Sequence, residues 1–162
     1  MASRSISAQQ SAPRSLYTAE ERARRDASVW TTVQAILAPL QFVIFIVSLY
    51  LVVRYLMTGT DSFAADSSIV VKTIALYTIM VTGSIWEKVV YGKWLFAEPF
   101  WWEDLFSMLV IALHTAYLVM LFGELGSVLD RMVVALAAYA SYAINATQFL
   151  LKLRAARLEA KA

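Results

Sequence analysis

The sequence predicts an all-α integral membrane protein, a four-helix bundle with both termini in the cytoplasm. Of its 162 residues, 60% are hydrophobic and only 16% are charged, which is more apolar than a soluble domain of this size. Four apolar runs are each long enough to cross a bilayer core, which takes about 20 helical residues. The runs do not alternate as barrel strands do, and backbone hydrogen bonding in lipid therefore makes them helices.

The first 28 residues are expected to form a cytoplasmic segment. Residues 1–15 are rich in Ser, Ala and Gln, which predicts a disordered tail. Thr18 and Glu21 have the spacing of a capping box, which predicts a short amphipathic helix on the membrane surface. The segment has no apolar core like that of a cleavable signal peptide, so we expect the first span to direct insertion itself.

The membrane domain is expected over residues 29–151. Its first helix, at about 30–54, contains WTTVQAILAPLQFVIFIVSLYLVV, and the second, at about 69–91, contains IVVKTIALYTIMVTGSIW. The third is expected at about 103–123. The fourth, at about 128–151, contains VLDRMVVALAAYASYAINATQFLL, and residues 152–162 extend it into the cytoplasm.

The charges that flank these runs predict the topology. Basic residues precede the first helix and follow the fourth, and Lys88 and Lys93 mark the connection between the second and third. The other two connections are short and contain mainly acidic residues. The positive-inside rule therefore places both termini and the middle connection in the cytoplasm. Lys72 and Arg54 are expected to snorkel toward the opposite membrane surface.

Each predicted helix carries one polar stripe at helical spacing. The stripes consist of Thr31, Gln34, Gln41 and Ser48; Thr73, Tyr77, Met80, Ser84, Glu87 and Tyr91; Glu103, Ser107, His114 and Tyr117; and Ser141, Asn145, Gln148 and Lys152. We expect the stripes to face one another around a polar cleft that opens to the cytoplasm, with His114 at its floor. Alternatively, Gln, Asn and Ser only join helices by hydrogen bonds, an interpretation favoured for Ser141, Asn145 and Gln148.

The segment between the second and third helices is unusually aromatic. It carries Trp86, Tyr91, Trp94, Phe96, Phe100, Trp101 and Trp102. These side chains are typical of an aromatic belt at the level of the lipid headgroups. They also suit a flat surface on which a large planar ligand stacks, and both interpretations can hold together.

The acids and the histidine are the candidate chemical groups. The helix dipole stabilises a carboxylate at the start of a helix, which explains the position of Glu103 or Asp104 but not that of Glu87. His114 suits proton transfer or axial ligation of the magnesium of a chlorin. One histidine and no cysteine exclude disulfides and a zinc site made of protein ligands alone.

Five stretches of the sequence together resemble one known family. They are LYTAEERARRDASVW, QAILAPLQF, GSIWEKVVYGKWLFA, WWEDLFSMLVIALHTAY and AINATQFLLKLRAARL, and the resemblance covers about residues 16–158. The chain resembles the 2-vinyl bacteriochlorophyllide hydratase family, also called chlorophyllide a 3-vinyl hydratase. The resemblance implies a lyase of bacteriochlorophyll synthesis that adds water to the vinyl group of ring A, giving a 1-hydroxyethyl group.

The resemblance also implies a location and partners. We expect a multi-pass protein of the bacterial inner membrane, cytoplasmic or intracytoplasmic. Its partners are a chlorophyllide or bacteriochlorophyllide substrate and the lipid bilayer, with no nucleic acid. A homo-oligomer, or association with other enzymes of pigment synthesis, is compatible with the alanine-rich fourth helix. No cofactor is expected.

The site residues of the hydratase are inferred from helical geometry. Glu87 and Glu103 are the expected acid and base, with His114 as a third candidate and Asp104 as a further one. Nine residues are expected to line the substrate pocket: Trp86, Tyr77, Ser84, Gln34, Gln41, Ser107, Tyr117, Asn145 and Gln148. Two other functions stay open: a non-catalytic bacteriochlorophyll-binding subunit of a photosynthetic complex, and a small transporter, against which the lack of internal repeats argues.

Overall fold

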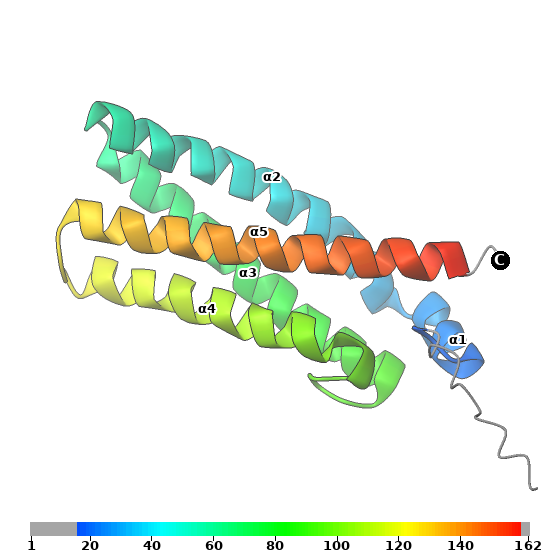
Figure 1. Ribbon diagram of the computed structural model, residues 1–162. Helices are drawn as coiled ribbons and strands as arrows, with labels where there is room; N and C mark the ends of the chain where they lie inside the picture. The colour runs from blue at the N-terminus through cyan, green and yellow to red at the C-terminus, as the bar shows by residue number, and fades with distance from the viewer. Residues whose placement is uncertain (1–15, 160–162) are drawn as a thin grey trace, which may run out of the picture.

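The computed structural model describes residues 16–159, and its regular elements are all helices (Figure 1). The predicted tail at 1–15 and the last three residues lie outside the described residues. The short helix α1 spans Ala19–Ala27, and the long helices are α2 (Val29–Thr58), α3 (Ser62–Tyr91), α4 (Trp101–Phe122) and α5 (Val128–Glu159). A 3-10 turn, η1 (Glu98–Phe100), precedes α4.

All four long helices are long and apolar enough to cross a membrane, so the all-helical, four-span prediction is confirmed. Capping residues mark the helix ends at the first three connections, which join α1 to α2, α2 to α3 and α3 to α4. Ser28 caps α2 through its side chain, which accepts the Trp30 N–H at 3.2 Å. Gly59 and Gly92 end α2 and α3 in the left-handed conformation that glycine adopts without steric cost. Helix α3 begins seven residues before its apolar run because Asp61 provides an N-cap.

The long helices form two antiparallel hairpins. Helix α2 packs most extensively against α3, and α4 against α5, whereas contacts between the two hairpins are sparser. We call the interface between the hairpins the seam. Figure 1 shows α1, the connection 92–100 and the end of α5 at one end of the bundle, which we call the loop end.

The outer faces of the bundle are apolar. Many large side chains on the four helices are exposed, among them Ile36, Phe42, Val71, Leu109 and Ile144. The buried core contains Phe45, Ile69, Leu76, Val110, Met132 and Tyr139, together with an unusual number of polar groups. Apolar outside and partly polar inside is the distribution expected when lipid replaces water as the solvent.

Lys72 does not snorkel, and that prediction is wrong. Its side chain is fully buried inside the bundle, whereas Arg54 is exposed. The reason is rotational position: Lys72 shares a face of α3 with Ile69, Thr73 and Leu76, all of which face the core. A lysine on that face has no short path to a membrane surface.

The predicted capping box at the start of α1 is confirmed. The Thr18 hydroxyl accepts the Glu21 N–H at 3.2 Å, and the Glu21 carboxylate accepts the Thr18 N–H at 2.8 Å. Helix α1 then docks on the loop end of α3, where Arg24 Nε donates to the Val90 carbonyl at 2.8 Å. The ring of Tyr17 stacks on that of Tyr91 with centroids 5.9 Å apart.

Candidate active site

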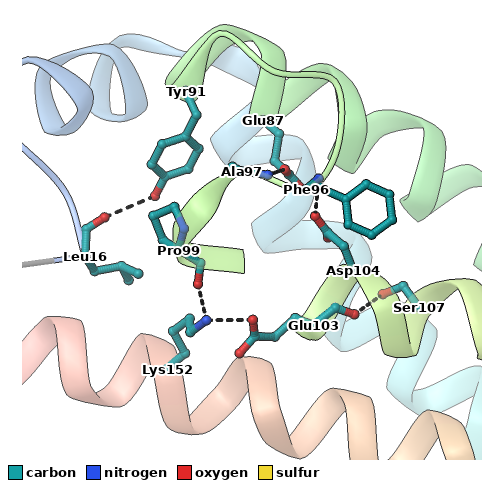
Figure 2. Close-up of polar contacts among 10 residues, drawn as sticks. All are labelled: Leu16, Glu87, Tyr91, Phe96, Ala97, Pro99, Glu103, Asp104, Ser107 and Lys152. Atoms are coloured by element: carbon teal, nitrogen blue, oxygen red, sulfur yellow. Dashed lines mark hydrogen bonds and ion pairs between the residues drawn. The ribbon is translucent and has the colours of Figure 1, made fainter. Parts of the chain in front are cut away.

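Two carboxyl groups lie together under the connection between α3 and α4. The Ala97 N–H donates to Glu87 Oε2 at 3.1 Å, and the neighbouring Phe96 N–H donates to Asp104 Oδ2 at 2.7 Å (Figure 2). The loop presents these N–H groups because Gly92 ends α3, Phe96 adopts a positive φ of 58°, and η1 turns the chain into α4. The loop therefore aims two successive backbone donors at carboxylates from two helices.

The carboxyl groups of Glu87 and Asp104 also lie close together. Their loop partners, Ala97 and Phe96, are adjacent in the chain, so the two carboxyl groups are neighbours, and the two residues are only 5% and 3% exposed. Ionised carboxylates only accept hydrogen bonds, so a bond between two carboxyl groups requires a proton on one of them. Two acids that share a proton inside a low-dielectric site are a recurrent source of general acid catalysis.

Glu103, the other expected acid, has a different partner. Lys152 Nζ donates to Glu103 Oε2 at 2.6 Å and also to the Pro99 carbonyl (Figure 2). The same ammonium lies 5.0 Å from the centroid of the Phe100 ring. The structure thus brings Glu87 together with Asp104, whereas Glu103 forms an ion pair that joins the end of α5 to the loop.

A hydrogen-bonded chain continues inward from Glu103. Ser107 Oγ donates to the Glu103 carbonyl at 2.9 Å, and Asn145 Nδ2 donates to Ser107 Oγ at 2.7 Å. The side-chain oxygens of Asn145 and Gln148 are buried without a partner among the described residues. Ser107 and Asn145 therefore lie about one helical turn inward from Glu103, where their hydrogen bond joins α4 to α5.

His114 lies deeper, in the middle of the bundle. It is fully buried, and its Nδ1 is 2.8 Å from the Val110 carbonyl. A carbonyl only accepts, so Nδ1 carries the proton, and Nε2, which has no partner among the described residues, is left as a free lone pair. The ring packs at 5.8 Å from that of Tyr139, whose hydroxyl is hydrogen-bonded to Ser48.

Most of the other residues expected to line the pocket make contacts elsewhere. Gln34 donates to Thr82 at 2.7 Å, the Trp86 indole donates to Thr31 at 3.0 Å, and Tyr77 is hydrogen-bonded to Thr115 at 2.6 Å. The Ser84 hydroxyl bonds the Val81 carbonyl of its own helix. Tyr117 donates to Asp66 at the opposite end, where Arg131 also reaches Asp66 at 3.5 Å. Gln41 is buried, with its side-chain oxygen unpartnered.

The aromatic residues divide into two groups. Trp94, Trp101 and Trp102 are exposed, as in an aromatic belt. The other group is packed under the loop, where the rings of Trp86, Tyr91 and Phe100 meet edge to face with centroids 5.8 to 5.9 Å apart. These packed rings form one wall beside the acids and are not available as a flat open surface.

The polar stripes meet in a closed interior. Glu87, Glu103, Asp104, Ser107 and His114 are all buried, so they do not line an open cleft. Two open hollows of about 360 and 370 Å³ lie elsewhere, one on α5 beside Gln148 and the other between α2 and α3. No group of three His, Cys, Asp or Glu side chains within residues 16–159 could hold a metal ion.

Two features of the interior were missed by the sequence analysis. Lys72 lies over the ring of Tyr142, with its ammonium 3.5 Å from the ring centroid. The spacing of Lys72 relative to Ile69 and Leu76 indicates the core face and could have revealed this position. The partnership of Glu87 with Asp104 had no such signal, because it depends on the conformation of the loop.

Comparisons with known proteins identify the family. Residues 17–155 match the family model described as 2-vinyl bacteriochlorophyllide hydratase (BCHF). A 2-vinyl bacteriochlorophyllide hydratase of Rhodobacter capsulatus is 66% identical over 148 residues, covering 91% of this chain and 85% of the relative. The protein of that name from Cereibacter sphaeroides is 63% identical over 149 residues, covering 92% of each chain. No solved structure matches the chain. The chain therefore belongs to the 2-vinyl bacteriochlorophyllide hydratase family.

Proposed function

We propose that this protein is a membrane hydratase of bacteriochlorophyll synthesis in which the Glu87–Asp104 pair supplies the proton that starts hydration of a pigment's vinyl group. The reaction follows from the relatives, which are named 2-vinyl bacteriochlorophyllide hydratase. The observation that supports the assignment of the acid is that two buried carboxyl groups from two helices lie side by side under the loop, an environment in which one of them favours its protonated form.

The chemistry needs one proton donor and one proton acceptor. The pair's proton passes to the terminal vinyl carbon, which becomes a methyl group and leaves a cation on the ring-adjacent carbon. That cation is stabilised by conjugation with the macrocycle, and the oxygen of a water molecule adds to it. The water then returns a proton to the ionised pair, so one molecule of water is added and both carboxyl groups regain their starting state.

The protein groups around the pair assist in distinct ways. The N–H groups of Phe96 and Ala97 stabilise the carboxylate that forms when the proton leaves. The Glu103–Lys152 ion pair holds η1 and α5 in place beside it. In the middle of the seam, the free Nε2 of His114 is suited to ligate the magnesium of the substrate.

The pigment reaches this buried site from the lipid. The substrate is large, flat and apolar, so it partitions into the bilayer. It would enter by parting the two hairpins, which contact each other less extensively than the helices within each hairpin do. We place the loop end in the cytoplasm of a bacterial inner membrane, because the basic residues that flank the spans gather at that end.

Incubation with chlorophyllide a tests the function. Membranes that contain the protein should convert the pigment to a product heavier by one water. Retention of unchanged pigment in a fixed ratio to the protein would instead indicate a pigment-binding subunit, and no interaction at all would contradict both.

Variants test the assignment of the acid. Glu87→Gln and Asp104→Asn keep the size of each side chain and its acceptor oxygen for the loop, and each should lower turnover by about 100-fold or more. Glu103→Gln should lower turnover less, because Lys152 keeps its hydrogen bond to the Pro99 carbonyl. Glu124→Gln, at an exposed carboxyl of the opposite end, is the matched control. Full activity of both Glu87→Gln and Asp104→Asn would refute the assignment.

A further inference from the structure

We propose that Lys72 is the binding residue for the carboxylate of the pigment, in a site that it shares with His114 inside the membrane-spanning bundle. This inference rests on the proposed function, because a chlorophyllide is a chlorin with a free carboxylic acid. It adds the side chain that recognises that acid.

Lys72 is a buried cation without a counter-charge. Its side chain is fully buried, and Nζ has no hydrogen-bond acceptor among residues 16–159. Its surroundings are the rings of Tyr142, 3.5 Å away, and Phe45, 6.0 Å away. Unpaired ionisable groups at membrane depth are costly, and their usual purpose is to meet a ligand or an ion.

The buried carboxyl groups described in the bundle are engaged elsewhere. Asp66 accepts bonds from Tyr117 and Arg131, and Glu103 is paired with Lys152. Glu87 and Asp104 bind the loop, and Glu87 is fifteen residues from Lys72 on α3, about 22 Å along the helix axis. The protein therefore leaves the position opposite Lys72 for an anion that comes from outside.

The position of Lys72 suits an amphipathic pigment. Lys72 is on α3 and Tyr142 is on α5, so the two residues face each other across the seam. The aromatic rings beside the ammonium provide flat apolar surfaces for a macrocycle, and cation–π contact stabilises Lys72 until a carboxylate replaces it. A ligand that parts the hairpins would reach Lys72 directly.

His114 completes the site. Its Nε2 is buried without a partner among the described residues, and its ring packs on Tyr139, which in turn meets the Phe45 ring beside Lys72. The acid pair lies farther along the same seam, since Asp104 and His114 are ten residues, or about 15 Å, apart on α4. The Lys72–His114 site is therefore an inner binding position of the seam, separate from the acid pair that would meet the vinyl group.

A comparison of charged and neutral pigments tests the proposal. Dissociation constants are measured for chlorophyllide a and its methyl ester with the full-length protein, Lys72→Met and Lys72→Arg in lipid nanodiscs. The unmodified protein should bind the acid about 10- to 100-fold more tightly than the ester, and Lys72→Met should abolish that preference by weakening only the acid. Lys72→Arg should retain part of it. Arg54→Met, which removes an exposed cation, is the control and should change neither constant.

Three results would overturn the proposal. Equal binding of acid and ester by the unmodified protein would overturn it, and this result does not depend on whether the Lys72→Met variant can be produced. Equal weakening of acid and ester by Lys72→Met would show a structural role instead. A lower melting temperature of Lys72→Met without pigment would also count against it, because removal of an unpaired buried ammonium should stabilise the bundle.

The binding measurement separates this proposal from the proposed function. A protein that prefers the acid but produces no hydrated pigment would refute the hydratase function and leave the Lys72 site standing. A protein that hydrates and binds the acid and the ester equally well would refute the Lys72 site and leave the hydratase function standing.

Discussion

Replacement of Lys152 with Met tests whether an ion pair fixes the loop over the acid pair. The substitution keeps the apolar stem of the side chain beside Phe100 and removes the ammonium from Glu103 and Pro99. The Glu103 side chain is only 8% exposed, so its carboxylate would lose its partner in a place that water barely reaches.

The size of the effect follows from this burial. Removing one partner of a buried ion pair costs about 3–5 kcal/mol. Because Lys152 is 25% exposed, water compensates in part, and we expect the lower end, about 3 kcal/mol. For a chain of this length, that corresponds to a fall in melting temperature of roughly 6–12 °C. The double variant Lys152→Met/Glu103→Gln should recover about 2 kcal/mol relative to the sum of the two single variants.

Thermal unfolding followed by tryptophan fluorescence in one detergent provides the assay. The unmodified protein, the two single variants and the double variant form a complete double-mutant cycle. A double variant whose loss equals the sum of the single losses would show that Glu103 and Lys152 do not interact, and the account of how the loop is held would fail.

Three further substitutions test other parts of the structure. Tyr117→Phe removes the hydroxyl that Asp66 accepts and should destabilise the protein by about 1–2 kcal/mol in the same unfolding assay; an unchanged melting temperature would contradict that bond. Gly83→Ala should be neutral or stabilising by up to about 1 kcal/mol, because the added methyl group meets only the Gln34 side chain at 3.7 Å, and a clear loss of stability would contradict this packing. His114→Ala should weaken pigment binding, and added imidazole should restore part of it; normal affinity without imidazole would exclude His114 as the magnesium ligand.

The architecture could be predicted because the solvent permits few alternatives. A chain in lipid must satisfy its backbone within each segment, so long apolar runs become helices. The capping box of Thr18 and Glu21 depends only on local spacing and was also predictable. The stripe of Glu103, Ser107 and His114 is buried as expected, because one helix with a single polar face has only one way to turn it inward.

The pairing of the acids could not be predicted from periodicity. Glu103 and Asp104 are adjacent in the sequence and about 100° apart around α4, so both are near the predicted stripe. Which of them meets Glu87 is decided by the loop, where the left-handed Phe96 directs its N–H to Asp104. Tyr77 and Ser84 were expected in the pocket but lie at the edges of a broad polar stripe on α3. Tyr77 is hydrogen-bonded to Thr115, and Ser84 donates to the backbone of its own helix.

The division of the bundle into two hairpins also bears on how the protein matures. Synthesis delivers α2 and α3 to the bilayer before α4 and α5. The acid pair takes one carboxyl group from each hairpin, Glu87 from α3 and Asp104 from α4. The proposed Lys72–His114 site also takes one residue from each of these two helices. A half-made chain that has only the first hairpin therefore has neither proposed site, and the residues of both come together only when α4 packs against α3.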